Sequence, residues 1–160
     1  MPRPVPLRLY TQISELDRLV WGDVEARLAD AGTYWVCAVP DGGAPHPRPV
    51  WGCWLDQTLQ VTIGSPVLRR QLDADPTITV TLDSGTDPVI LEGVIEPGRS
   101  VNPSLVDAFV AAYDAKYDWT YDVATYGPPL VVVPDTVIAW RTAGFAGRKS
   151  FESVGRWRFP

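Results

Sequence analysis

The stretch TYWVCAVPDGGAPHPRPVWGCWLDQTLQVTI, residues 33–63, carries the clearest strand pattern in the chain. Residues 33–39 are rich in β-branched and aromatic side chains, and the Asp-Gly-Gly sequence at 41–43 that follows them is typical of a turn. Residues 46–54 predict the next strand. Apolar and polar residues then alternate over 58–63, as in a strand that buries one face and exposes the other. This stretch therefore predicts three consecutive strands.

The rest of the chain adds helices and further strands around this stretch. Residues 14–31 carry apolar side chains at three- and four-residue spacings, with Ser14 able to cap, which predicts an amphipathic helix. Asn102 and Pro103 have the residue types of a helix start, and an apolar stripe follows them as far as Lys116. The other expected elements are a short helical segment at 67–74, strands at 77–82, 89–95, 130–133 and 137–140, and a C-terminal tail at about 141–160.

These elements predict a mainly β domain with flanking helices. A doubly wound parallel sheet would alternate strands and helices along the chain, and only two substantial helices are expected here. An antiparallel closed barrel fits better, because closure would hide the strand edges that an open sheet exposes. The 160 residues are 46% apolar, enough for one packed core, so we expect a single domain over 1–160.

Composition narrows the possible partners. The formal net charge of −5 argues against a nucleic-acid partner, because that affinity depends on a surplus of Lys and Arg. The longest apolar runs, such as 129–134, are far shorter than the roughly 18 residues of a membrane span. Residues 1–9 lack the apolar segment of a signal peptide. We therefore expect a cytoplasmic protein with no membrane or nucleic-acid partner.

Few residues have the types that metal or acid–base chemistry needs. The chain has one histidine, which disfavours a His-based metal site, and Cys37 and Cys53 are interpreted as buried free thiols. The acidic and aromatic residues of 113–122 suit either paired catalytic carboxylates or a solvated helix end beside packed aromatic side chains. We favour the second interpretation, and we assign no catalytic side chain and no metal.

Two segments have the residue types of a ligand site. The first has two hydroxyls and two cations around a short helix, which suits a phosphate group; exposed arginines can equally be surface charge. The second begins a strand with two prolines and then becomes apolar, so a planar ring could bond to its main chain; an edge strand with a surface histidine is the alternative. The first segment comprises Thr62, Gly64, Ser65, Arg69 and Arg70, and the second His46, Arg48, Pro49, Val50 and Trp51.

Short motifs follow one another in a fixed order from residue 35 to residue 159: WVCAV at 35–39, DG at 41–42, PH at 45–46, PVWG at 49–52, WLD at 54–56, Leu72, DP at 75–76, LDSG at 82–85, EG at 92–93, KYDW at 116–119 and RWRF at 156–159. This order resembles the pyridoxamine 5′-phosphate oxidase-related flavin-binding family, most strongly its actinobacterial members that use FMN or a deazaflavin coenzyme.

This resemblance implies a six-stranded, Greek-key split β-barrel that forms a homodimer, with two cofactor sites at the interface. It implies that Pro49, Val50, Trp51 and Gly52 line the flavin ring. It also implies that Thr62, Gly64, Ser65 and Arg70 hold the phosphate, and that Arg156, Trp157 and Arg158 reach the partner subunit's site. Val67 and Leu68 stand where relatives commonly carry cations, which leaves Arg69 and Arg70 as the positive charges of that segment.

The function implied is an oxidoreductase that uses FMN, or alternatively the deazaflavin coenzyme F-420, on a small-molecule substrate. The cofactor would transfer a hydride while the protein positions it and excludes water. One alternative is a non-catalytic protein that binds a flavin or another planar ligand, and another is a purely structural dimer with a degenerate pocket. If the pocket binds a phosphate-bearing cofactor, Arg70→Ala is expected to weaken that binding about tenfold or more.

Overall fold

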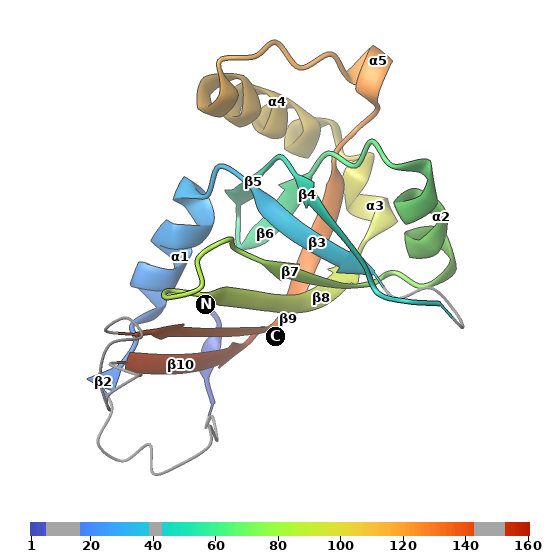
Figure 1. The fold of residues 1–160 in the computed structure, drawn as a ribbon. Coiled ribbons are helices and arrows are strands. Elements are labelled where there is room, and N and C mark those ends of the chain that lie inside the picture. The colour runs from blue at the N-terminus through green and yellow to red at the C-terminus, as the bar shows by residue number, and fades with distance from the viewer. Residues whose placement is uncertain (6–16, 39–42, 143–152) are drawn as a thin grey trace.

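The computed structural model describes residues 1–5, 17–38, 43–142 and 153–160 (Figure 1). These residues form one large sheet with helices around it. The strands are β1 (Arg3–Pro4), β2 (Asp17–Arg18), β3 (Tyr34–Ala38), β4 (His46–Val50), β5 (Gly52–Leu55), β6 (Thr58–Val61), β7 (Thr77–Thr81), β8 (Val89–Ile95), β9 (Leu130–Arg141) and β10 (Ser153–Arg158). The helices are α1 (Trp21–Asp30), α2 (Pro66–Ala74), α3 (Pro97–Ser100), α4 (Pro103–Tyr117) and α5 (Val123–Tyr126).

The sheet is antiparallel apart from the pairing of β2 with β10. Its order is β1-β10-β9-β8-β7-β3-β4, and the long strand β9 also pairs with β6, which in turn pairs with β5. The predicted mainly β class with flanking helices is confirmed. Counting β4 and β5 as one strand interrupted at Trp51, the strands from β3 to β9 in the described residues make the six that were expected, and β1, β2 and β10 extend the sheet.

The expected closure is wrong, because the sheet is open between β4 and β5. In the described part of the chain β4 pairs only with β3, and β5 pairs only with β6. The predicted single strand at 46–54 is also wrong, because the chain leaves the sheet at Trp51. The result, within the described residues, is a split barrel in which β4 and β5 each leave one strand edge unpaired.

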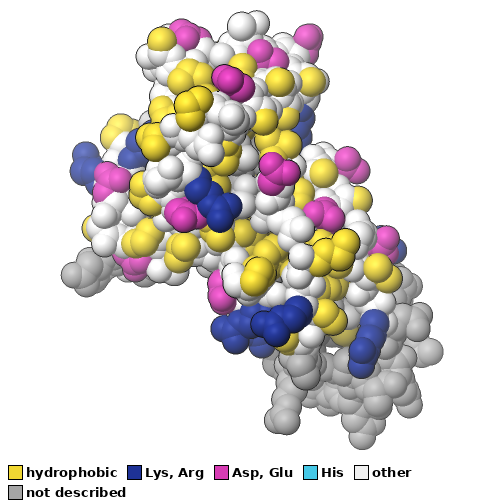
Figure 2. Space-filling model, turned by 180° about the vertical axis from the view of Figure 1, so that it is seen from behind, with side chains coloured by type: hydrophobic (Ala, Val, Ile, Leu, Met, Phe, Trp, Pro, Cys, Tyr) yellow, Lys and Arg dark blue, Asp and Glu magenta, His cyan; other side chains and the backbone are white. Residues whose placement is uncertain are grey.

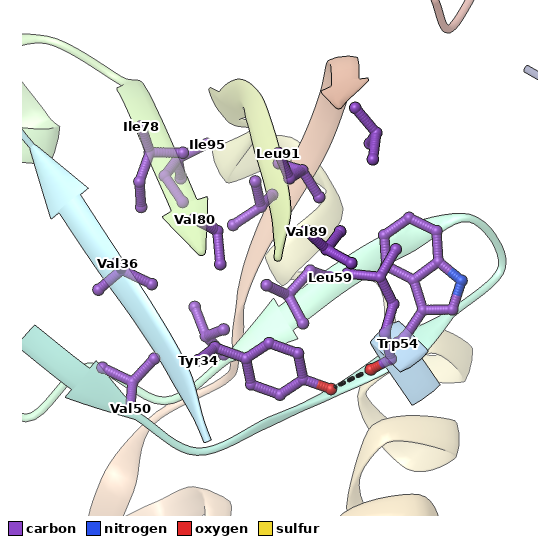
Figure 3. Close-up of a cluster of buried hydrophobic side chains, with 14 of the residues drawn as sticks. Tyr34, Val36, Val50, Trp54, Leu59, Ile78, Val80, Val89, Leu91 and Ile95 are labelled. Atoms are coloured by element: carbon purple, nitrogen blue, oxygen red, sulfur yellow. Dashed lines mark hydrogen bonds between the residues drawn. The ribbon is translucent and has the colours of Figure 1, made fainter. Parts of the chain in front are cut away.

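The main core lies among the facing strands of the curved sheet (Figure 3), with side chains of α1 and α2 added to it. Its side chains come from facing positions of β3, β6, β7 and β8, and they include the fully buried Tyr34, Leu59 and Leu91. The hydroxyl of Tyr34 donates a hydrogen bond to the carbonyl of Leu28 at 2.5 Å, so the buried phenol has a partner and ties β3 to α1.

A second apolar cluster explains why the alternation over 58–63 misled the prediction. Thr58 and Gln60 are 4% and 2% exposed, so β6 is buried on both faces. The second face is covered by α4 and the segment after it, through Phe109 and Tyr121, together with Cys53 of β5. A strand that carries polar side chains on one face can still be buried there when a distant helix packs over it.

Other elements agree with the prediction or differ in their bounds. The expected helices at 67–74 and 102–116 and the hairpin at 77–95 are confirmed, with Asn102 capping α4. The helix expected over 14–31 begins only at Trp21, and the expected Ser14 cap and the turn residues 41–42 lie outside the described residues.

The two strands expected after residue 129 are one continuous strand, β9. A bulge between Glu92 and Gly93 in the pairing of β8 with β9 accommodates Pro134, which pairs with Gly93. A Cβ atom on Gly93 would lie 2.2 Å from the carbonyl oxygen of Val133, so this close approach requires glycine. No helix in the described ranges is long and apolar enough to cross a membrane.

Candidate functional site

The unpaired edge of β4 presents hydrogen-bond acceptors. Pro47 pairs with Cys37 and Pro49 with Trp35 in the antiparallel ladder. Proline has no N–H, so these are the non-hydrogen-bonded pairs, in which the carbonyl points away from the partner strand. The carbonyls of Pro47 and Pro49 therefore face the open edge, and no N–H accompanies them at these two positions. The Pro47 carbonyl accepts a hydrogen bond from the Arg48 guanidinium at 2.8 Å, so the Pro49 carbonyl is the better acceptor for a ligand that carries an N–H donor.

A cleft of about 380 Å³ lies where β4 and β6 end and α2 begins, and we call it the first cleft. It brings together residues that are distant in the sequence and that the sequence analysis assigned to a ring site and a phosphate site. Its walls are Arg48, Pro49, Val50, Trp51, Thr62, Ile63, Gly64, Ser65 and Leu68. Seven of these nine are predicted site residues; Ile63 and Leu68 are the additions.

The start of α2 gives the first cleft a polar wall. Ser65 is the N-cap, and its hydroxyl accepts a hydrogen bond from the backbone N–H of Leu68 at 3.3 Å, which leaves its own proton free to donate. The positive end of the α2 dipole also favours an anionic group here. Leu68 is fully buried in the core, so this position has a packing role where a cation would not fit.

Backbone contacts fix the bend at Trp51 and Gly52. The phenol oxygen of Tyr117 accepts a hydrogen bond from the backbone N–H of Gly52 at 3.0 Å, and the Tyr117 hydroxyl lies 2.9 Å from the Gly52 carbonyl. The Lys116 ammonium donates to the same carbonyl at 3.2 Å. The rings of Trp51 and Tyr117 are stacked, with centroids 4.8 Å apart and planes at 7°. Burial lowers the pKa of Lys116 and raises the pKa of Tyr117 to about 12. These contacts hold Trp51 at the mouth of the cleft.

A second concave site of about 220 Å³ adjoins the first cleft, and we call it the aromatic pocket. It shares Trp51, Thr62, Ile63 and Gly64 with the first cleft, so the two are continuous. Its other walls are Arg69, Tyr113, Trp119, Tyr121 and Tyr126. Sequence reasoning placed Arg69 at a phosphate and missed the four aromatic residues, although the density of Tyr and Trp in 113–126 was a signal.

The carboxylates of this region have structural roles. Asp114 accepts the backbone N–H of Tyr121 at 2.7 Å, and Asp122 caps α5 by accepting the N–H of Ala124 at 3.0 Å. The interpretation of 113–122 as a helix end beside packed aromatic rings therefore agrees with the structure. Cys53 is a buried free thiol as expected, whereas Cys37 is only half-buried.

The remaining predicted site residues lie outside both sites. His46 starts β4 and Arg70 is an exposed residue of α2. Gly52 lies in β5, where a Cβ would be 2.3 Å from the Gln60 carbonyl oxygen. The C-terminal trio lies on β10: Trp157 is buried in the core of its own chain, and Arg158 forms an ion pair of 3.6 Å with Asp135, while Arg156 is half-buried.

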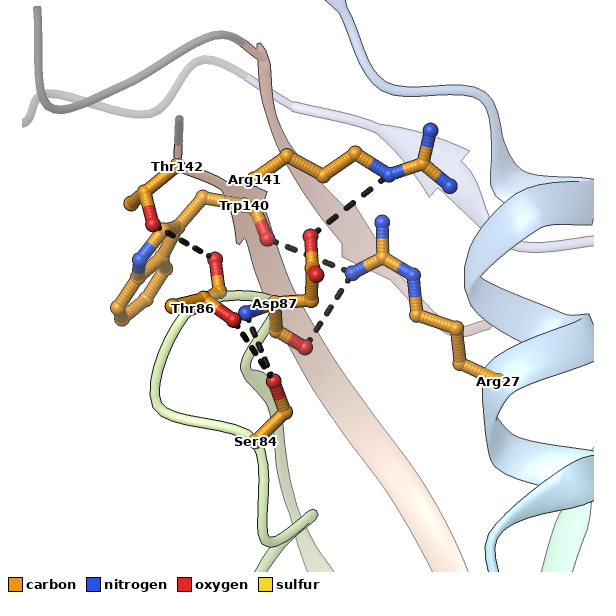
Figure 4. Close-up of polar contacts among 7 residues, drawn as sticks. All are labelled: Arg27, Ser84, Thr86, Asp87, Trp140, Arg141 and Thr142. Carbon is orange, nitrogen blue, oxygen red and sulfur yellow. Dashed lines mark hydrogen bonds and ion pairs between the residues drawn. The ribbon is translucent and has the colours of Figure 1, made fainter. Parts of the chain in front are cut away.

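A polar cluster around Arg27, in the last turn of α1, braces the helix against the sheet (Figure 4). Arg27 donates to the backbone carbonyls of Asp87 and Trp140, at 3.4 and 3.3 Å, and Asp87 also pairs with Arg141 at 3.8 Å. These contacts tie α1 to the β7–β8 loop and to the end of β9. In the space-filling view, Lys and Arg form separate small groups between acidic and apolar side chains (Figure 2).

Comparison with solved structures identifies the architecture. A FAD-binding protein from Mesorhizobium loti matches with a TM-score of 0.61 and 15% identity, over 88% of this chain and 96% of its own. An F-420 reductase matches with a TM-score of 0.55 and 21% identity, over 71% of this chain and 94% of its own. A protein from Clostridium acetobutylicum, related to general stress protein 26 and of the pyridoxinephosphate oxidase family, matches with a TM-score of 0.53 and 14% identity. The match covers 76% of this chain and 86% of that protein.

This chain has the split-barrel fold of the pyridoxamine 5′-phosphate oxidase-like proteins. The identities are low, so the likeness concerns the fold. No family model and no curated protein matches the sequence. The fold resemblance seen in the ordered motifs is thus confirmed, and the part of the split barrel that opens along β4 is where the first cleft lies.

Proposed function

We propose that the protein is an oxidoreductase that binds a flavin-type cofactor, FMN or the deazaflavin coenzyme F-420, in the first cleft. The observation that carries this proposal is the convergence of 48–51 and 62–65, two separately predicted segments, on one cleft. Solved proteins of the same fold include a FAD-binding protein and an F-420 reductase. When bound, such a cofactor supplies hydride transfer, so the protein needs no acid or base of its own.

The residues of the cleft match the parts of such a cofactor. The pyrimidinedione end of a flavin or deazaflavin ring carries an imide N–H, which suits the carbonyl of Pro49 at the edge of β4. Trp51 supplies an aromatic surface that Tyr117 holds in place. The phosphate belongs at Ser65 and the first turn of α2, with Arg48 as the cation on the wall of this cleft.

A homodimer would complete the site. Trp35, Trp51 and Val67 are 40%, 44% and 42% exposed; Trp51 directly follows β4, and Trp35 pairs with Pro49 from the neighbouring strand β3. Exposed apolar side chains next to an open strand edge suit a subunit interface, which would also exclude water from the ring. Sedimentation of the purified chain should give twice the mass of 17.6 kDa; a monomer would contradict this part of the proposal.

Titration of cofactor-stripped protein with FMN and, in parallel, with F-420 tests the proposal, followed by cofactor fluorescence. Saturable micromolar binding of either is expected, and binding of neither would overturn the proposal. Reduction of the bound cofactor by a nicotinamide donor, or its reoxidation by a substrate, separates an enzyme from the alternative, a protein that binds a planar ligand without turnover.

A further inference from the structure

We infer that the aromatic pocket binds a flat aromatic acid, with its ring among Trp51, Trp119 and the tyrosines and its carboxylate at Arg69. As the substrate of the reaction proposed above, this acid would lie against the cofactor, so that role rests on the proposed function. The binding site itself stands on the geometry of the pocket. Its volume of about 220 Å³ is below the roughly 300–1,000 Å³ of sites for drug-sized ligands, which restricts the ligand to one or two rings.

The walls of the pocket select for an aromatic ring. Tyr121 is buried, whereas Trp119 and Tyr126 are 47% and 49% exposed and stand at the mouth. Trp51 and Trp119 meet nearly edge to face, with planes at 78° and centroids 6.5 Å apart. A flat ring can contact one indole face to face and another edge to face, whereas a puckered ring makes neither contact fully.

Arg69 supplies the specific polar contact. Its Nε donates to the carbonyl of Ile63 at 2.5 Å, which anchors the guanidinium on the shared wall between the two sites. Across the described residues, its two terminal nitrogens have no hydrogen-bond or ion-pair partner, and the side chain lies on the pocket wall close to Tyr121. An anchored guanidinium with free terminal N–H groups is suited to a planar carboxylate, which accepts two parallel hydrogen bonds.

The position of Arg69 also separates its role from that of its neighbour. Arg70 is exposed on α2 and lines neither the first cleft nor the aromatic pocket. The two arginines are therefore a matched pair: both are on the same helix and carry the same charge, but only Arg69 faces the pocket. Replacing each in turn distinguishes a specific contact from the general effect of one positive charge.

Calorimetric titration with 2-naphthoate tests the inference, with 2-naphthamide as the uncharged control. The wild type should bind 2-naphthoate saturably and more tightly than 2-naphthamide. Arg69→Ala should weaken 2-naphthoate at least tenfold and change 2-naphthamide little, whereas Arg70→Ala should leave both unchanged. Trp119→Ala, at an exposed position that the fold does not need, should weaken both ligands. Circular dichroism of each variant checks that it is folded.

Three results would overturn the inference: no binding of 2-naphthoate by the wild type, equal binding by Arg69→Ala, or displacement of 2-naphthoate by FMN or F-420, which would place it in the first cleft. The first two outcomes are independent of the proposed function. If neither cofactor binds but binding of 2-naphthoate depends on Arg69, the aromatic pocket is supported and the proposal of a flavin-type cofactor fails. If a cofactor binds and 2-naphthoate does not, the cofactor proposal is supported and the inference about the aromatic pocket fails.

Discussion

Gly52 shows how a single residue sets the shape of the cleft. A Cβ atom there would lie 2.3 Å from the carbonyl oxygen of Gln60 and 2.9 Å from a methyl carbon of Val61. Glycine therefore allows β5 to approach β6 directly after the bend at Trp51. The backbone of this residue is in turn the anchor for Tyr117 and Lys116.

Gly52→Ala should lower the free energy of unfolding by about 1–3 kcal/mol, because neighbouring backbone must move to admit the methyl group. Urea denaturation measures the loss. Gly22→Ala is the matched control: a Cβ at Gly22 has open space around it, and alanine in α1 should raise stability by about 0.5–1 kcal/mol. Equal effects of the two substitutions would show that the approach of β5 to β6 is not a constraint.

The buried phenols predict how stability depends on pH. Burial raises the pKa of both Tyr117 and Tyr121 from 10.0 to about 12. Between these values the folded protein keeps protons that the unfolded chain has lost, so the free energy of unfolding falls as the pH rises from about 10 to about 12. Tyr117 is half-buried, so solvent screening limits its loss to about 1 kcal/mol, whereas Tyr121 is buried and should account for the larger part of the fall.

Tyr121→Phe should therefore reduce the slope of stability against pH, measured by urea denaturation between about pH 9 and about pH 11.5. The variant also loses the hydrogen bond from the Tyr121 hydroxyl to the Gly127 carbonyl, so it should be less stable than the wild type at neutral pH. Tyr126→Phe, at an exposed position, serves as the control. If the slope of stability against pH is unchanged in Tyr121→Phe, the assignment of the pH dependence to the Tyr121 phenol is contradicted.

At the scale of the elements, Arg27 fixes α1 against the sheet. Its guanidinium donates to carbonyls of the β7–β8 loop and of β9, which are 60 and 113 residues away along the chain. Arg27→Ala should lower the free energy of unfolding by about 1–2 kcal/mol in thermal or urea denaturation, since two carbonyls lose a charged donor. Arg70→Ala, at an exposed position, should change it by less than about 0.5 kcal/mol. An Arg27→Ala variant as stable as the wild type would show that the brace contributes nothing.

Local patterns predicted the elements whose signals lie within a few residues. Asn102 before α4 caps its helix as expected, and the hairpin of β7 and β8 follows from its alternation. The break at Trp51 was not predictable in this way. It depends on Tyr117, which is 65 residues from Gly52, and no local feature of 46–54 indicates that partner.

The candidate site shows the same difference between residues with local signals and residues that only the fold brings together. The residues 48–51 and 62–65 were chosen from local chemistry and from the resemblance, and the fold brings them to one cleft. The aromatic pocket combines residues from 51 to 126, so it exists only once α4 packs on β5 and β6. Trp157 was assigned to a partner's site, but the sequence alone does not show that the ring of Trp21 packs against both Trp157 and Phe159, with its centroid 5.4 Å from each.

The molecule as a whole combines one packed split barrel with an edge that is left unpaired. The main core and the α4 cluster hold the strands in place, while β4 ends the sheet order with two outward-facing proline carbonyls. An unpaired edge favours association of strands, and prolines limit this by removing N–H donors. A cofactor ring and a second subunit would together cover this edge.

The cofactor affinity of a variant with a filled cleft tests the central claim most directly. A Cβ at Gly64 has open space, so Gly64→Leu should fold normally and place its side chain in the wall that the first cleft and the aromatic pocket share. Gly85→Leu, also in open space but on the β7–β8 loop, is the control. We predict that the wild type and Gly85→Leu bind FMN or F-420 with equal micromolar affinity, and that Gly64→Leu binds the cofactor at least tenfold more weakly. Undiminished binding by Gly64→Leu would place the cofactor elsewhere and contradict the proposal that it binds in the first cleft.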